Sequence, residues 1–196
     1  MDEIEKLPPT AWVLIAIAAA LGFGISWLWR WYRQYRARKS LRLAVTATGS
    51  DHVVDVLVPD GMGGGFHVDF LLLTSRGVLV VDLRDVQGNI FGGDQMADWT
   101  VMDGPRRSTF TNPQSGLYDR IAAVKAISGE VPVEGRVVFT RRGRFPKGLP
   151  KWTLMIDALR AEFPGMEHGS DTPTSYSEGW GKIKGAVKPS YMSHMR

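Results

Sequence analysis

The chain has 196 residues, no cysteine and a formal net charge of +4 at pH 7. The absence of cysteine excludes disulfides, thiolate nucleophiles and cysteine-based zinc sites. About 150 residues follow the most apolar segment, which is enough for one domain with its own core.

An uncharged apolar run occupies residues 11–29, after a short tail at residues 1–10. Its length is close to the roughly 20 residues that cross a bilayer core, so we expect one transmembrane helix. A cleaved signal peptide is the alternative. The run is long for such a segment and the residues before it are acidic on balance, so a membrane anchor is favoured.

Basic residues crowd the juxtamembrane segment that follows, residues 30–47: Arg30, Arg33, Arg36, Arg38, Lys39 and Arg42. Positive charge next to a membrane helix favours the cytoplasmic side, which predicts a single-pass protein of the inner membrane with its C-terminal domain in the cytoplasm. From residue 46 onward the chain has 17 basic and 17 acidic residues. The excess charge is therefore explained by topology and by attraction to anionic lipid.

The remaining sequence predicts an α/β domain at residues 48–163 and a loosely ordered C-terminal tail at residues 164–196, with a short turn near Trp180. The apolar patterns predict strands at 52–58, 66–74, 78–86, 99–102, 108–111 and 136–140, and helices at 113–127 and 152–163.

Two carboxylates, Asp69 and Asp82, interrupt apolar strands that a tight turn joins. A buried, unpaired carboxylate costs several kcal/mol, so each needs a cation, a metal ion or water beside it. Neighbouring strands lie about 5 Å apart, so the two aspartates can share one divalent cation. Arg84 projects from the same face as Asp82. The alternative is a solvated face or a simple pair with this arginine.

The segment 67–88 resembles the nuclease-related domain family (NERD), a branch of the PD-(D/E)xK nuclease superfamily. The matching features are Asp69 on one strand, the turn Arg76-Gly77, and Asp82-Leu83-Arg84 where the family has Glu-x-Lys. Trp99 and Asn112-Pro113 also fall where the family has a Trp and an Asn-Pro. The resemblance covers residues 48–140 and implies a restriction-endonuclease-like mixed sheet flanked by helices.

The resemblance also implies a chemistry. Family members of this type cleave nucleic acid with a divalent ion, Mg²⁺ or Mn²⁺. By that resemblance the metal ligands are Asp69, Asp82 and the backbone carbonyl of Leu83, and the catalytic residues are Asp69, Asp82 and Arg84.

Several of these positions depart from the family pattern. A lysine can orient or deprotonate a water, whereas Arg84 stays protonated and serves only as a donor. Asp51 or Asp55 is only a loose substitute for the family's Gly-Glu, and Gln114 lies two residues before the family's Gln position, here Gly116. The alternative function is therefore a catalytically inactive module that binds nucleic acid or a protein partner at the membrane.

Two further features are weaker. His67 alternates with Asp69 on one strand face and is a marginal additional metal ligand. A basic cluster follows the strand at 136–140 and either contacts phosphates or forms a solvated loop: Arg141, Arg142, Arg144, Lys147 and Lys151.

Overall fold

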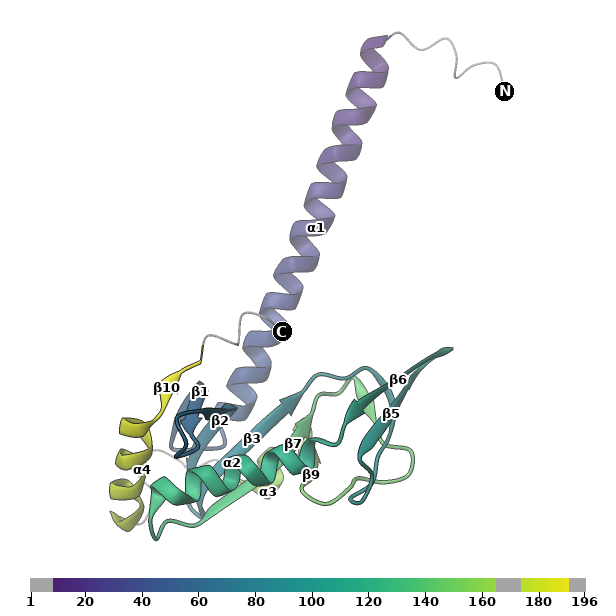
Figure 1. The fold of residues 1–196 in the computed structure, drawn as a ribbon. Coiled ribbons are helices and arrows are strands. Elements are labelled where there is room, and N and C mark those ends of the chain that lie inside the picture. Colours follow the sequence, from purple (N-terminus) through teal and green to yellow (C-terminus); the bar gives the residue numbers. More distant parts are fainter. Residues whose placement is uncertain (1–8, 165–173, 191–196) are drawn as a thin grey trace. The chain divides into compact units, whose positions relative to one another are not determined.

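The computed structural model describes residues 9–164 and 174–190. The chain divides into two compact units, Met1–Leu43 and Ala44–Arg196. Figure 1 labels most of the helices and strands, which follow one another along the chain in this order: α1 (Pro9–Thr46), β1 (Asp51–Pro59), β2 (Gly65–Thr74), β3 (Gly77–Arg84), β4 (Gly88–Phe91), β5 (Asp98–Asp103), β6 (Arg106–Thr111), α2 (Pro113–Ser128), β7 (Val133–Phe139), β8 (Gly143–Arg144), β9 (Thr153–Met155), α3 (Ile156–Glu162), α4 (Thr174–Ala186) and β10 (Lys188–Pro189).

Helix α1 is continuous over 38 residues and contains the apolar run at 11–29. Its described aromatic side chains are exposed, including Trp27, Trp29 and Trp31. The side chains of residue 11 and residues 13–18 lie outside the described part. Within the part that is described, no helix is both long enough and apolar enough to cross a membrane, so the expected transmembrane helix is not found there.

The second unit confirms the predicted mixed α/β fold. Its main sheet has six strands in the order β10-β1-β2-β3-β7-β9. The strands from β10 to β3 pair antiparallel, whereas β3–β7 and β7–β9 pair parallel. The turn between β2 and β3 requires Gly77, which has φ +119°, and a Cβ there would lie 2.2 Å from the Pro132 carbonyl oxygen.

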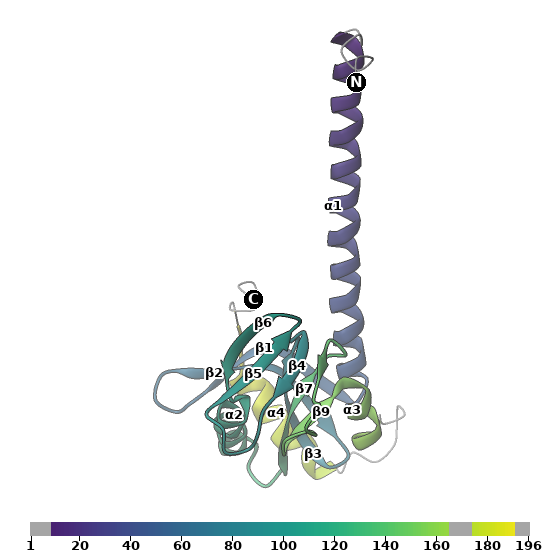
Figure 2. The same ribbon diagram turned by 90° about the vertical axis from the view of Figure 1, so that its right-hand side faces the viewer.

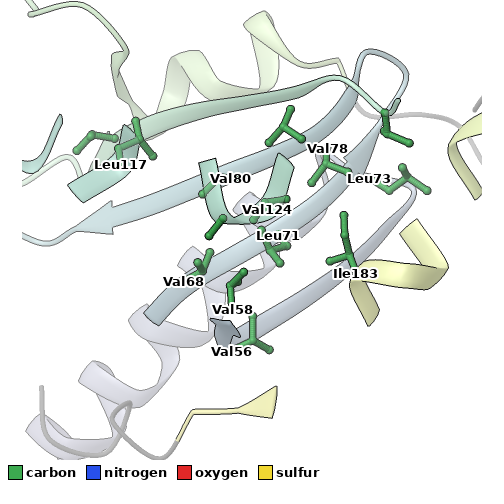
Figure 3. Close-up of a cluster of buried hydrophobic side chains, with 14 of the residues drawn as sticks. Val56, Val58, Val68, Leu71, Leu73, Val78, Val80, Leu117, Val124 and Ile183 are labelled. Atoms are coloured by element: carbon green, nitrogen blue, oxygen red, sulfur yellow. The ribbon is translucent and has the colours of Figure 1, made fainter. Parts of the chain in front are cut away.

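Helices α2 and α4 cover one face of this sheet, and Figure 3 shows the apolar side chains between them. Leu117 and Val124 of α2 and Ile183 of α4 are at most 1% exposed. The strands contribute Val56, Val58, Val68, Leu71, Leu73, Val78 and Val80. The apolar stripe of α2 that includes Leu117 and Val124 therefore faces the sheet. Asn112 caps this helix by accepting a hydrogen bond from the Gln114 amide, and Pro113 occupies its first turn.

A second sheet has four strands in the order β6-β5-β4-β8. Its strands β4, β5 and β6 are labelled in Figure 2. Trp99 on β5 is fully buried. Its ring packs against Phe110, Phe139 and Phe145 at centroid distances of 5.9 to 6.1 Å. Trp99, which matches the tryptophan of the family pattern, therefore packs between the second sheet and the main sheet.

The predicted helix at 152–163 is shorter than expected. Residues 153–155 pair with the exposed edge of β7 as strand β9, and the helix begins only at Ile156. The sequence favours a helix there, but the free edge of the sheet offers backbone hydrogen bonds to an extended segment.

The C-terminal segment also differs from the expected loose tail. Residues 165–173 and 191–196 lie outside the described residues, but 174–190 form α4 and β10. Trp180 is 3% exposed. Gly179 permits this packing, because a Cβ there would lie 2.4 Å from the Val131 side chain. The last described residues are therefore part of the folded unit.

Candidate active site

Asp69 lies on β2, partly buried, with 18% of its side chain exposed. Its Oδ2 accepts a hydrogen bond from the Leu83 amide at 2.9 Å, and its Oδ1 lies 3.1 Å from His67 Nε2. Burial raises the pKa of the Asp69 carboxyl, and the negative charge of Asp82 raises it further. An ionised Asp69 is therefore costly in this place, and a bound cation would lower that cost.

Asp82 on β3 is almost fully buried, with 2% of its side chain exposed. Its Oδ2 accepts hydrogen bonds from Arg84 Nη2 at 2.8 Å and from Arg120 Nη1 at 3.3 Å. Arg120 also donates from Nε to the His67 carbonyl oxygen at 2.6 Å. Two arginines from different elements thus neutralise this carboxylate.

Arg120 was not among the residues singled out from the sequence. It lies three residues after Leu117 and four before Val124, on the stripe of α2 that faces the sheet. A charged side chain on the buried stripe of a helix needs a partner of opposite charge in the sheet below. Its position on the stripe is therefore the sequence feature that could have identified Arg120.

Arg84 is the other cation of the site, with 27% of its side chain exposed. Its Nε is buried and has no hydrogen-bond partner within the described residues. A buried donor without a partner costs about 1–3 kcal/mol.

A possible metal site groups Asp55, His67 and Asp69, whose ligand atoms all lie within 4.8 Å of one another. Asp55 adopts a left-handed conformation on β1, with φ 52°. His67 Nδ1 lies 2.9 Å from the Oγ of Ser190, the residue after β10, and this contact helps to orient the imidazole. Asp51 and Asp55 were the two residues that could replace the family's glutamate, and of these Asp55 lies in the candidate site.

Asp51 lies elsewhere in the domain. Its Oδ2 accepts hydrogen bonds from Trp180 Nε1 at 2.7 Å and from Lys184 Nζ at 2.8 Å. These bonds connect α4 to β1, and Asp51 does not belong to the group of Asp55, His67 and Asp69.

The donor set of Asp55, His67 and Asp69 fits a divalent cation. Two carboxylate oxygens suit Mg²⁺ or Mn²⁺, and the imidazole adds a nitrogen that transition metals accept more readily than Mg²⁺ does. Asp82 is outside this group, since its Oδ2 faces two arginines. The expected sharing of an ion by Asp69 and Asp82, and ligation by the Leu83 carbonyl, stay predictions.

The Asn-Pro motif has a structural part in the domain. Gln114, 4% exposed, donates from Nε2 to Asp94 Oδ1 at 3.0 Å and to the Lys151 carbonyl oxygen at 2.6 Å. Asn112 donates to the Met96 carbonyl oxygen at 2.9 Å. These bonds tie the start of α2 to the loops beside it.

Comparison with known proteins identifies the class. The model of the nuclease-related domain matches residues 31–140, more than half of the chain, so the chain belongs to the nuclease-related domain family. The expected family membership is confirmed.

An individual relative adds little about function. An uncharacterized protein of Bacillus anthracis is 30% identical over 71 residues, which are 36% of this chain and 34% of that protein. The chain thus spans about a third of the length of this relative. No solved structure matches the chain.

Proposed function

We propose that this chain is a metal-dependent phosphodiesterase that acts on nucleic acid. The observation that supports this most directly is the convergence of Asp55, His67 and Asp69 beside the Asp82–Arg84 pair, in a domain of the nuclease-related family. A divalent ion at such a site polarises a phosphate and lowers the pKa of a bound water.

The residues of the chain have separate roles in this proposal. Asp55, His67 and Asp69 hold the ion. Arg84 contacts the phosphate through the exposed part of its guanidinium, and it cannot act as a base because it stays protonated. Arg120 holds both Asp82 and the β2 backbone, and so positions α2 against the two site strands.

A second candidate function is a non-catalytic binding module for nucleic acid or a protein partner. The observation that favours it is the double pairing of Asp82 with Arg84 and Arg120, which leaves this carboxylate neutralised without a metal ion. In that case the charge cluster stabilises the domain and the surface around it does the binding.

We further propose that α1 anchors the protein in the inner membrane, with the C-terminal unit in the cytoplasm. The support is the uncharged run at 11–29 and the basic segment that follows it. A nuclease-related unit on such an anchor would act on nucleic acid close to the membrane.

Cleavage assays with the full chain in detergent test the proposed activity. We expect the wild type to cleave labelled single- or double-stranded DNA or RNA only with Mg²⁺ or Mn²⁺. Asp69→Ala should lower the rate by at least 100-fold, because it removes a metal ligand. Asp119→Ala, which removes an exposed carboxylate from α2, is the matched control and should cleave normally.

Arg84→Lys separates the two candidate functions. A lysine keeps the positive charge and can position a water, so a working but impaired site should become faster. If neither the wild type nor Arg84→Lys cleaves any of these substrates and neither binds Mg²⁺ or Mn²⁺, the proposed catalysis is wrong and the binding module remains.

A further inference from the structure

One face of the four-stranded sheet carries a row of exposed side chains. Asn89 of β4 pairs with Arg144 of β8 and with Met102 of β5, and Met102 pairs with Arg107 of β6. Directly paired residues point to the same face of a sheet. All four side chains are exposed, so the row crosses the whole outer face of this sheet.

The opposite face of the same sheet is packed against the core. Ile90 and Val101, which alternate with the residues of the row, are 1% and 5% exposed. A sheet with one packed and one free face is common in antiparallel architectures. The row therefore lies on a firmly supported surface and does not depend on a mobile loop.

Three arginines and one aspartate line a recess on this outer face. The recess is open, with a volume of about 390 Å³, and its lining includes Gln87, Asn89, Met102, Arg141, Arg142 and Arg144. Arg141 and Arg142 pair with Asp157 and Asp85. Asp103 also lines the recess and accepts a hydrogen bond from Gln87 Nε2 at 3.2 Å.

The two arginines at the ends of the row differ from Arg141 and Arg142 in having no acidic partner among the described residues. Arg107 and Arg144 make no ion pair within the described part of the chain. They are separated by three strand spacings, about 14 Å. Two unpaired cations at this distance can contact different phosphates of one nucleic-acid backbone.

The recess lies close to the end of strand β3. Strands β3 and β7 run parallel and end side by side at Arg84 and Phe139. Just beyond, the Thr140 amide donates to the Arg84 carbonyl oxygen at 3.1 Å, and its hydroxyl donates to Asp85 Oδ1 at 2.7 Å. Arg142 donates to Asp85 Oδ2 at 2.8 Å. The recess thus lies near the end of β3, the strand that carries Asp82 and Arg84.

We propose that this outer face binds the phosphate backbone of a nucleic-acid strand whose scissile phosphate lies at the Asp69–Arg84 site. This inference rests on the proposed function. The Asn89 amide and the Met102 side chain lie between the two cations, and they offer a hydrogen bond and an apolar contact to the sugars and bases. Anionic lipid requires only charge, so this mixed row fits nucleic acid better.

Binding of a fluorescein-labelled oligonucleotide by the full chain in detergent tests the proposal. EDTA in the buffer prevents metal-dependent cleavage. We expect Arg107→Ala with Arg144→Ala to weaken binding roughly tenfold or more and to lower the slope of log K against log salt by about 1–2. Lys125→Ala with Lys182→Ala removes the same charge from α2 and α4 and should bind within twofold of the wild type.

The outcomes distinguish this inference from the proposed activity. Equal binding by the wild type and the Arg107/Arg144 variant, or no binding by the wild type, overturns the inference. Arginine-dependent binding without any cleavage supports it and counts only against the catalysis. Hydrogen exchange in nanodiscs tests lipid: protection of 102–107 and 141–144 by anionic lipid, with oligonucleotide binding unchanged in the variant, overturns it.

Discussion

The two aspartates of the candidate site, on adjacent strands, have different electrostatic surroundings. Asp82 is nearly inaccessible but has two arginine partners, whereas Asp69 is more accessible and has an amide and an imidazole. A carboxylate that lacks a full positive partner is the one that a divalent cation would stabilise. In the proposed metal site, Asp69 is therefore the ligand on which binding should depend most.

Asp69→Asn should stabilise the metal-free protein at neutral pH. The folded-state pKa of Asp69 is raised, so its contribution to stability is fully present below the ordinary value of 3.8 and is lost as pH rises through the folded pKa. An asparagine has no such loss and can still accept the Leu83 amide. Thermal unfolding of both proteins between pH 3.5 and 8 measures this difference.

The same variant should also lose the stabilisation that Mn²⁺ gives the wild type. Asp82→Asn is the contrasting variant: it leaves Arg84 and Arg120 without a charged partner and should cost about 3 kcal/mol at neutral pH. If Mn²⁺ raises the melting temperature of Asp69→Asn as much as that of the wild type, Asp69 is not a metal ligand.

The elements at the C-terminus have a larger part in the domain than their composition indicates. Helix α4 contributes Trp180 and Ile183 to the core, and β10 pairs with β1 next to Asp55. The Ser190 amide donates to the Asp55 carbonyl oxygen at 2.8 Å, while its hydroxyl contacts His67. The last described residues thus support two of the three possible metal ligands.

Ile183→Ala tests this contribution at the scale of the element. It removes a fully buried side chain and should lower the free energy of unfolding by about 2–5 kcal/mol. Lys182→Ala, on the exposed side of the same helix, should change it by less than about 0.5 kcal/mol. Urea unfolding followed by circular dichroism measures both, and similar stability of the two variants would show that α4 is not part of the cooperative unit.

At the scale of the whole molecule, the chain combines an apolar N-terminal run, a basic segment and a charge-balanced domain. Positive residues are retained on the cytoplasmic side because their transfer across the membrane is unfavourable. The proposed orientation follows from this asymmetry alone, so it can be tested independently of the active site.

A reporter fused after Arg196 tests the topology. Alkaline phosphatase, active only in the periplasm, should be inactive at this position, and green fluorescent protein should fluoresce. Neutral substitution of the five basic residues in 30–39 should weaken the orientation. Phosphatase activity of the unmodified fusion would contradict the proposed topology.

Local sequence patterns determined most of the strands, helix α2 and the Asp82–Arg84 pair. Alternation along a strand puts residues two apart on one face, so the contact between these two side chains follows from the sequence alone. The Gly77 turn is likewise a local requirement. The family resemblance then indicated which strands carry the candidate site.

Only the tertiary structure decided which other residues join the site. Arg120 reaches Asp82 across 38 residues of chain, and Ser190 reaches His67 across 123. Asp55 lies on a third strand whose distorted backbone turns its side chain toward His67 and Asp69. Such contacts depend on how helices and strands pack, and a linear pattern with a period of two or 3.6 residues carries no information about that packing.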